Sequence, residues 1–335
     1  MKRSAPLWLA LAAVLLACLA LLAFRGRPSG PGPADPAAQA AQEAPAAAAP
    51  GTIRIGSYNM AMFGLSKEKR PATMEILARI GSNFDLLAMQ EVGSNGSSAS
   101  EETCAEVMDA YLALVNEVSG GDHYAYVRGD QYAFLYRKDR LALKSSGPYS
   151  GAEAFTYRPL VAYFQVRGRP LDFAVITVHT RPSLAKREIP ELAAAMDEVS
   201  ASLSEPDVLC LGDFNADGSY YAEAGASVMS ASAAPVSGDG PTSSSGQTST
   251  WLAGFSPDRY ATLIPNDADT TVAAGSDCAY DRMEISSAME GDYDGRWGVL
   301  KPGELWDLSA CEGGKESAGG ERALSDHYPV WAEFS

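Results

Sequence analysis

The sequence predicts a domain in which α-helices cover β-sheets that are buried on both faces. Apolar residues have helical spacing over 107–118 and 192–203, and Pro190 suits the start of the second helix. Short strand-like apolar runs occupy 53–58, 86–89, 132–136, 173–178 and 208–211. Several of these runs are apolar enough to be buried on both faces, which requires further layers on each side of a sheet. The segment 230–250, rich in Ser, Gly and Thr, predicts a long loop.

The composition is that of an ordinary soluble protein. The chain has 335 residues, of which 46% are apolar and 20% are charged, so a sizeable core is expected. Its formal net charge of −16 argues against a protein that binds nucleic acid through its own Lys and Arg side chains. An enzyme that binds phosphate through a divalent cation needs less positive charge of its own, so a metal-dependent nuclease stays open.

The N-terminal segment 1–27 is predicted to be a signal peptide or a membrane anchor. Lys2 and Arg3 precede an unbroken apolar run over 7–24, and no small-x-small cleavage site follows it closely, which favours an anchor. The Pro- and Ala-rich segment 28–51 predicts a disordered linker, because it has almost no large apolar residue to bury. We therefore expect a catalytic domain over 52–335 that is secreted, periplasmic or tethered to the membrane.

The cysteines predict neither a zinc site nor a disulfide framework. No CxxC pair or Cys/His ligand spacing occurs among the five cysteines. Cys210 lies within an apolar run and is expected to be a buried free thiol. In an oxidising compartment one disulfide is feasible, and Cys278 with Cys311 is the candidate pair.

Polar side chains recur where the predicted strands stop. These side chains are Asn59, Gln90, Glu91, His179, Thr180, Asp213 and Asn215, joined by Asp326 and His327 just before the strand-like run 328–334. Rigid scaffolds display functional side chains at strand ends. We therefore expect these residues to converge on one site.

The residue types in this set indicate metal-assisted hydrolysis of a phosphate ester. Carboxylate and amide oxygens are the hard ligands that Mg²⁺ and Mn²⁺ prefer. Two of the three histidines of the chain, His179 and His327, belong to the set. Histidines beside carboxylates suit proton transfer near neutral pH.

Five motifs, taken in order, resemble the endonuclease/exonuclease/phosphatase superfamily over nearly the whole folded part. They are Ile55-Gly56-Ser57-Tyr58-Asn59, Met89-Gln90-Glu91-Val92, Val178-His179-Thr180, Gly212-Asp213-Phe214-Asn215 and Ser325-Asp326-His327-Tyr328-Pro329-Val330. Within that superfamily, Leu263-Ile264-Pro265, Asp269-Thr270-Thr271 and Cys278-Ala279-Tyr280-Asp281-Arg282 look like the deoxyribonuclease I group. The resemblance implies an α+β fold of four layers, αββα, in which two mixed sheets pack face to face between helices.

The resemblance also implies a metal site. Glu91 and Asp326 would hold a divalent metal, Mg²⁺ or Mn²⁺, and Asn59 would assist. Asp269 and Thr271 would lie near a structural Ca²⁺ site, although Asp269 equally suits a plain turn.

The catalytic residues implied by the resemblance are His179, His327, Asp281, Asp130, Asp213 and Asn215. His327 would pair with Asp281. His179 would pair with an acid near Tyr132, for which Asp130 is the candidate. A carboxylate beside an imidazole fixes its tautomer and stabilises its cation, so one pair would deprotonate water while the other protonates the leaving oxygen. Asp213 and Asn215 would orient water and phosphate. Asp213 is also a rival base, and the division of labour between the histidines stays open.

The departures from the deoxyribonuclease I pattern concern the binding of duplex DNA and one disulfide. The pattern has Arg two residues after the metal-binding Glu, where this chain has Gly93. It has an aromatic residue two positions before the acid of the first pair, where this chain has Arg128. Its phosphate-binding Arg lies two residues before a Pro, whereas Arg158, the candidate here, directly precedes the Pro. The Cys that would pair with Cys278 is replaced by Gly218.

These observations predict a monomeric, divalent-metal-dependent phosphodiesterase, most simply an extracytoplasmic endonuclease that hydrolyses DNA. One alternative is a sphingomyelinase or another phosphoesterase on the same scaffold, which the apolar leader and Gly93 favour. A second is a catalytically silent surface binding module. It is disfavoured because the metal and acid–base positions are all present.

Overall fold

The computed structural model describes residues 51–93, 101–221, 252–273, 278–312 and 320–335. The leader 1–27, the linker up to residue 50 and the loop 230–250 lie outside the described residues, so what the sequence indicates for them stays a prediction. Among the described residues, no helix combines the length and the apolar character that a bilayer span requires.

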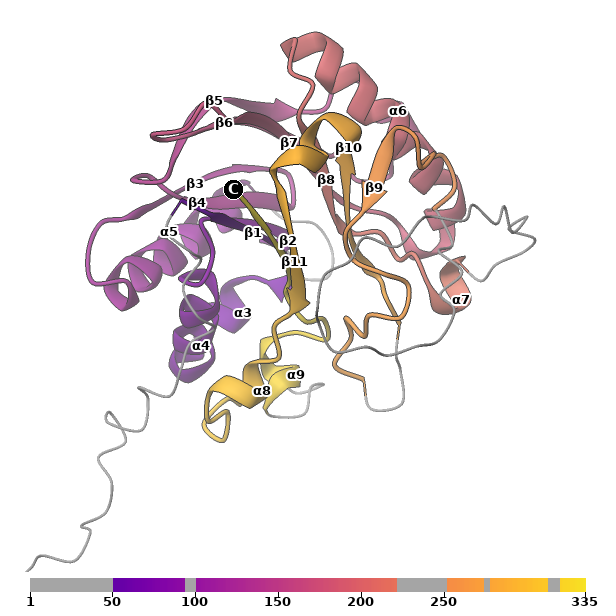
Figure 1. The fold of residues 1–335 in the computed structure, drawn as a ribbon. Helices are drawn as coiled ribbons and strands as arrows, with labels where there is room; N and C mark the ends of the chain where they lie inside the picture. The colour runs from indigo at the N-terminus through magenta and orange to yellow at the C-terminus, as the bar shows by residue number, and fades with distance from the viewer. Residues whose placement is uncertain (1–50, 94–100, 222–251, 274–277, 313–319) are drawn as a thin grey trace, which may run out of the picture. The chain divides into compact units, whose positions relative to one another are not determined.

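The described residues form two six-stranded mixed sheets (Figure 1). The first sheet has the strand order β11 (Tyr293–Val299), β12 (Val330–Phe334), β1 (Ile53–Phe63), β2 (Leu86–Val92), β4 (Tyr132–Arg137) and β3 (Tyr124–Gly129). The second has the order β5 (Leu141–Pro148), β6 (Leu160–Val166), β7 (Asp172–His179), β8 (Val208–Asp213), β10 (Asp281–Ser286) and β9 (Tyr260–Thr262). Each sheet contains one parallel pair, β1 with β2 and β7 with β8, and its other pairs are antiparallel.

The two sheets pack face to face around a shared apolar core. Successive side chains of a strand point to opposite faces, so Leu86 of β2 faces this core while Leu87 faces the other way. Across the core, the rings of Phe134 on β4 and Phe164 on β6 meet edge to face with centroids 6.3 Å apart. Central strands such as β2 and β8 are therefore buried on both faces, as their apolar composition predicts.

Helices cover the outer face of each sheet and complete the four layers. Leu77 of α4 (Pro71–Gly81) and Tyr111 of α5 (Glu101–Val118) pack in the outer core of the first sheet. Leu192 of α6 (Ala185–Leu203) packs in the outer core of the second sheet. Figure 1 shows α4 and α5 beside the first sheet and α6 beside β7 and β8. The predicted four-layer α+β sandwich is confirmed.

Several short helical segments connect these elements. They are α3 (Leu65–Glu68), α7 (Gly218–Tyr221), α8 (Pro302–Leu305), α9 (Glu321–Leu324) and the 3₁₀ turns Ala152–Ala154, Pro182–Leu184 and Ser287–Asp292. The expected helix start at Pro190 is wrong, because Pro190 lies inside α6. The 3₁₀ turn that begins at Pro182 runs directly into α6, so Pro182 is the proline at the start of this helical segment.

The candidate disulfide between Cys278 and Cys311 is absent, because both residues are free thiols. Cys311 lies in the helical layer of the first sheet, with its Sγ 3.8 Å from the carbonyl oxygen of Ala72. Cys278 instead lies beside Gly218. Cys210 is a buried free thiol, as predicted.

Candidate active site

The two parallel strand pairs determine where the site forms. Asn59 lies opposite Gln90 near the ends of β1 and β2, and His179 lies opposite Asp213 at the ends of β7 and β8. The antiparallel strand β10 begins where β8 ends, which puts Asp281 opposite Asp213. Five polar residues from the two sheets therefore lie at or near strand ends: Asn59, Gln90, His179, Asp213 and Asp281.

The segment before β12, which contains Ser325 and His327, is hydrogen-bonded to β1 at Asn59. The Ser325 hydroxyl donates a hydrogen bond of 2.7 Å to the Asn59 carbonyl and accepts one of 3.1 Å from the His327 amide. His327 also forms an isolated β-bridge with Thr271. These contacts explain why a residue near the C-terminus lies close to Asn59 of β1.

Asp213 occupies the centre of the site and lies between two imidazoles. Its Oδ2 is 3.4 Å from His179 Nε2, 3.5 Å from His327 Nε2 and 3.0 Å from the donor Asn59 Nδ2. Its Oδ1 accepts a 2.9 Å hydrogen bond from the Asn215 amide. Burial acts to raise the pKa of the Asp213 carboxyl. The two histidines and these hydrogen bonds outweigh burial and hold that pKa below its usual value.

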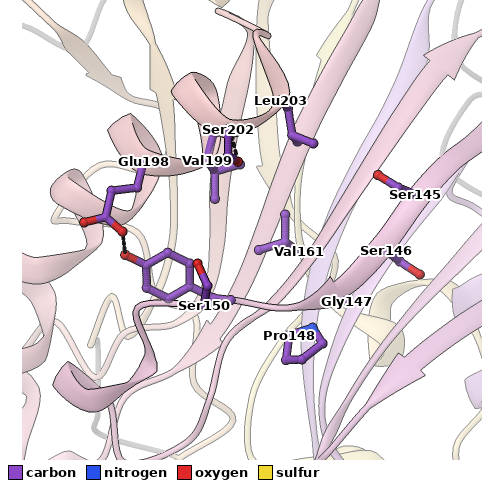
Figure 2. Close-up of a pocket in the computed structure, with 11 residues that line it drawn as sticks. Ser145, Ser146, Gly147, Pro148, Ser150, Val161, Glu198, Val199, Ser202 and Leu203 are labelled. Atoms are coloured by element: carbon purple, nitrogen blue, oxygen red, sulfur yellow. Dashed lines mark hydrogen bonds between the residues drawn. The ribbon is translucent and has the colours of Figure 1, made fainter.

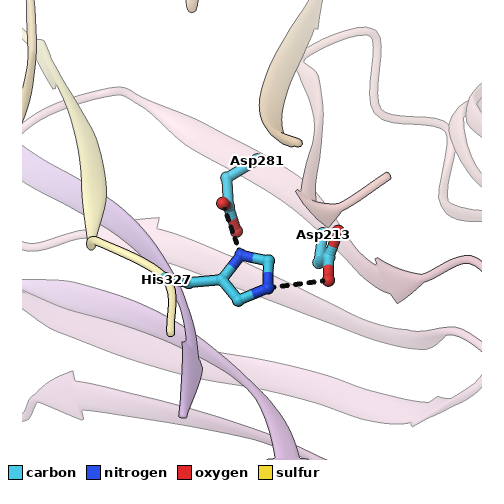
Figure 3. Close-up of side chains that lie close together, drawn as sticks. All are labelled: Asp213, Asp281 and His327. Carbon is cyan, nitrogen blue, oxygen red and sulfur yellow. Dashed lines mark hydrogen bonds and ion pairs between the residues drawn. The ribbon is translucent and has the colours of Figure 1, made fainter. Parts of the chain in front are cut away.

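His327 is held on both sides by carboxylates (Figure 3). Its Nδ1 lies 2.8 Å from Asp281 Oδ2, a hydrogen-bond distance, while Nε2 faces Asp213. Burial acts to lower the pKa of His327, but Asp281 and Asp213 hold it well above its usual value. Burial also raises the pKa of Asp281, which is fully enclosed. The predicted His327–Asp281 pair is therefore present in the structure.

The same three groups lie within 4.8 Å of one another, close enough to hold a metal ion. Nδ1 of His327 is already engaged by Asp281 at hydrogen-bond distance, however. We therefore interpret Asp213, Asp281 and His327 as an acid–base array.

His179 lacks the hydrogen bond to Asp130 that the sequence predicts. Its Nδ1 has no hydrogen-bond partner among the described residues and is 4.0 Å from Glu91 Oε1. Asp130 is exposed in the two-residue turn between β3 and β4, where its φ of 45° is left-handed. Asp213 is thus the nearer carboxylate to His179. The backbone amide of His179 donates to the Tyr132 hydroxyl at 2.9 Å, which fixes the end of β7.

Glu91 and Asn59 form the other half of the site. Asn59 Nδ2 donates to Glu91 Oε1 at 3.1 Å, and Glu91 Oε2 accepts from the Met62 amide at 2.7 Å. Left-handed φ angles occur at Ala61 (41°), Met62 (50°), Glu91 (60°) and Asn215 (47°). Such conformations are costly for residues other than glycine and gather at functional sites. Their concentration here supports a functional role for this edge of the sheets.

A buried lysine, Lys67, stabilises the half of the site that Glu91 and Asn59 form. The sequence did not predict this role. Lys67 of α3 donates three hydrogen bonds of 2.6–2.7 Å, to the carbonyl oxygens of Met60, Ala61 and Leu324. Burial lowers the pKa of Lys67 to about 8, although Asp326 and Glu91 act to raise it. Lys67 therefore ties the end of β1 to the segment that carries Asp326. The sequence signal for this role is weak, because Lys67 stands among other charged residues, Glu68, Lys69 and Arg70.

Glu91 and Asp326 have the chemistry expected of a divalent metal site. Asp326 is exposed and Glu91 is partly exposed, so both carboxylates are accessible to an ion. Both act electrostatically on the same ammonium group of Lys67. Their oxygens are hard ligands of the kind that Mg²⁺ prefers, and Asn59 orients Glu91 by its hydrogen bond.

The remaining predicted residues lie around this centre. Arg158 is exposed, and its Nε donates to the Tyr149 carbonyl at 3.1 Å. The Asp269 Oδ1 accepts from the amide and the hydroxyl of Thr271 at 3.2 and 3.3 Å, and its Oδ2 lies 3.7 Å from Lys301 Nζ. Asp269 thus has the contacts of a turn residue, and a Ca²⁺ site there stays a prediction.

A separate hollow of about 190 Å³ lies between β5 and α6 (Figure 2). Its walls include Val161 and Leu203, and its carboxylate, Glu198, accepts a 2.6 Å hydrogen bond from the Tyr149 hydroxyl. The described lining of this hollow contains no histidine and no second acid. The hydrolytic chemistry therefore belongs to the cluster around Asp213.

Comparison with known proteins agrees with this fold. Deoxyribonuclease-1 of Mus musculus is 28% identical over 293 residues, covering 84% of this chain and 90% of the mouse protein. Human deoxyribonuclease-1-like 2 is 29% identical and covers 85% of this chain and 92% of its own length. A solved structure from Bacteroides thetaiotaomicron, described as an endonuclease/exonuclease/phosphatase family protein, shares the fold. Its TM-score is 0.53 at 16% identity, covering 84% of this chain and 97% of that one.

The family itself follows from a match to its sequence model. The model of the endonuclease/exonuclease/phosphatase family matches residues 56–263, which is more than half of the chain. That range begins in β1 and ends just after β9, so it spans strands of both sheets. With deoxyribonucleases among its relatives over most of its length, the chain belongs to the endonuclease/exonuclease/phosphatase family.

Proposed function

We propose that this protein is a divalent-metal-dependent phosphodiesterase that cleaves DNA internally. The observation that carries the proposal is the carboxylate of Asp213 between two imidazoles, one of which is backed by Asp281. A hydrolase needs one group to accept a proton from water and another to protonate the leaving oxygen, and this arrangement offers both. The deoxyribonuclease relatives support DNA as the substrate.

His327 is assigned as the proton donor. Its raised pKa means that the imidazolium form is favoured near neutral pH. Asp281 fixes the ring through Nδ1, so Nε2 carries the proton that reaches the leaving oxygen. His179, whose Nε2 lies beside Asp213, is then the group that accepts a proton from the attacking water.

Glu91 and Asp326 would hold the metal, with Asn59 fixing the position of Glu91. When bound there, a divalent cation would supply positive charge for the phosphoryl oxygens. This is how a chain with a net charge of −16 would bind a polyanion.

The test is plasmid nicking by the full-length protein with Mg²⁺ and Ca²⁺, set against the same reaction in EDTA. We expect nicking that EDTA abolishes. His327→Ala should lower the rate by roughly 10²- to 10⁴-fold, the usual contribution of an acid–base group. His123→Ala is the matched control, because His123 lies before β3, outside the site, and should leave the rate unchanged.

Nicking that survives EDTA, or that is equal in His327→Ala, would contradict the proposal. A parallel assay with sphingomyelin vesicles separates the substrates. Intact plasmid with hydrolysed sphingomyelin would keep the acid–base assignment and replace DNA with a lipid phosphodiester.

A further inference from the structure

An exposed aromatic ring lies against one of the catalytic histidines. Tyr157 is 38% exposed, and its ring packs on that of His179 with centroids 5.5 Å apart and an interplanar angle of 32°. Single exposed aromatic residues are common on protein surfaces. This one packs on His179, so a substrate group bound at His179 lies beside its ring.

The residue after Tyr157, Arg158, lines a cationic pocket. It has a volume of about 500 Å³, within the roughly 300–1,000 Å³ of small-molecule sites. Arg158, Arg128 and Asp130 line it, together with two prolines and Leu160. Two guanidinium groups against one carboxylate leave the pocket positive in a chain whose net charge is −16.

Hydrogen bonds fix the position of the Arg158 side chain. Its Nε donates to the Tyr149 carbonyl, and the Tyr149 hydroxyl donates to Glu198 of α6. Figure 2 shows that second contact. A guanidinium held in this way is suited to phosphate, because its planar fork can donate two parallel hydrogen bonds.

The ring and the pocket together suit one nucleotide: the Tyr157 ring suits its base, and the cationic pocket suits its phosphate. Bases stack on aromatic side chains whatever their sequence, but only bases that are not inside a duplex stack are free to do so. Among the described residues around Glu91, little suits a duplex, since Gly93 has no side chain and Met62 presents an apolar one that is 55% exposed.

We propose that Tyr157 and the Arg128–Arg158 pocket form a subsite for one unpaired nucleotide next to the scissile phosphate. The base lies on Tyr157, and the neighbouring phosphate lies between the two arginines. The protein therefore prefers single-stranded DNA to duplex DNA. This inference rests on the proposed function and specifies the substrate class of the same site.

The first test compares cleavage of a labelled single strand, the same strand annealed to its complement, and bis(p-nitrophenyl) phosphate, all with the full-length protein. The wild type should cleave the single strand faster than the duplex. Tyr157→Leu should lower the ratio of single-strand to duplex rates by roughly tenfold, the typical effect of losing one stacked base. Tyr157→Phe, which keeps the ring, should retain the ratio. Trp297→Leu, at an equally exposed aromatic residue on β11, is the matched control and should not change it.

The second test measures binding of the single strand by fluorescence anisotropy in the inactive His327→Ala background. With Arg128→Ala and Arg158→Ala combined, the slope of log Kd against log salt should become shallower by about 0.7, the value for one phosphate contact. Arg79→Ala is the control, because Arg79 pairs with Glu75 on the surface of α4.

The outcomes separate the two proposals. A wild type that cleaves the duplex at least as fast, or a Tyr157→Leu effect equal on both strands, overturns the subsite and leaves the nuclease standing. An unchanged salt slope overturns the phosphate pocket. Failure to hydrolyse either DNA or the small diester overturns the proposed function, and the subsite falls with it.

Discussion

Strand β10 buries two ionisable side chains, Arg282 and Glu284, whose environments differ. Arg282 is 1% exposed and donates to the Ile264 carbonyl at 2.9 Å. Glu284 is fully buried. Its Oε2 accepts from the Thr262 hydroxyl at 2.8 Å, and its Oε1 has no hydrogen-bond partner among the described residues. Burial raises the pKa of Glu284 to about 8, although Thr262 and Arg282 act to lower it. The carboxyl is therefore protonated in the folded protein at neutral pH.

This protonation makes stability depend on pH in a defined direction. In the unfolded chain Glu284 has an ordinary pKa near 4.3, so between that value and about 8 only the unfolded state loses the proton. The stabilising contribution is complete below about pH 4 and is lost as pH rises to about 8. We predict that Glu284→Gln gains stability relative to wild type as the pH is raised from 5 to 8. Urea titrations across that range would measure it, and a difference that is independent of pH would contradict the assignment.

For single residues, the sequence predicted which side chains form the site better than it predicted which of them contact one another. Asp281 and His327 pair as expected, because a motif at each strand end specifies them. Asp130 was predicted to pair with His179, but it is exposed in the turn between β3 and β4, and its left-handed backbone was not visible in the sequence. Lys67 was missed because its role depends on three carbonyl oxygens, and backbone acceptors leave no signal in residue types.

Among the elements, α7 begins at a residue that departs from the deoxyribonuclease I pattern. Gly218 has φ +60°, and a Cβ built there would lie 3.2 Å from the Cys278 Sγ. That separation is close to what two bonded cysteines require, so the geometry for a disulfide is retained although one cysteine is gone.

We predict that Gly218→Cys forms a disulfide with Cys278 under oxidising conditions. The cross-link should raise the free energy of unfolding by about 2–4 kcal/mol relative to the reduced variant. Gly218→Ser is the control, because it adds the side chain at the same left-handed φ without the bond. Non-reducing mass spectrometry and thermal melts with and without reductant would show the effect. A free thiol at Cys278 in the oxidised variant would refute it.

Element boundaries were also predicted in part. The apolar runs located the centres of β1, β2, β4, β7 and β8, since buried strands need apolar residues on both faces. The runs end before the polar residues that build the site, which are Asn59 within β1 and the last residues of β7 and β8, His179 and Asp213. Edge strands such as β5 and β11 were not predicted. Their exposed polar residues lack the apolar pattern of a core strand.

At the scale of the whole molecule, the site depends on the packing of one sheet against the other. Asn59 and Glu91 belong to the first sheet, whereas His179, Asp213 and Asp281 belong to the second. Apolar contacts such as that of Phe134 with Phe164 hold the two sheets together face to face. This pairing of sheets could not be derived from periodicity and came from the family resemblance alone.

We predict that Phe164→Ala costs about 3–5 kcal/mol of stability, the usual loss for a buried phenylalanine. The ring is fully buried and contacts Phe134, Tyr136 and Phe173. Activity should be lost at a lower temperature, in step with unfolding. Phe164→Leu, which keeps most of the apolar volume, should cost clearly less. Chemical denaturation of both variants would check this, and equal stability of Phe164→Ala and wild type would contradict it.

The position of Asp213 between His179 and His327 has a consequence for how the enzyme responds to pH. One carboxylate lies beside both rings, at 3.4 and 3.5 Å, so removing its charge changes the electrostatic surroundings of both rings at once. Asp213 is also one of the charges that hold the pKa of His327 high, so a change at Asp213 alters the protonation of His327 as well as the surroundings of His179.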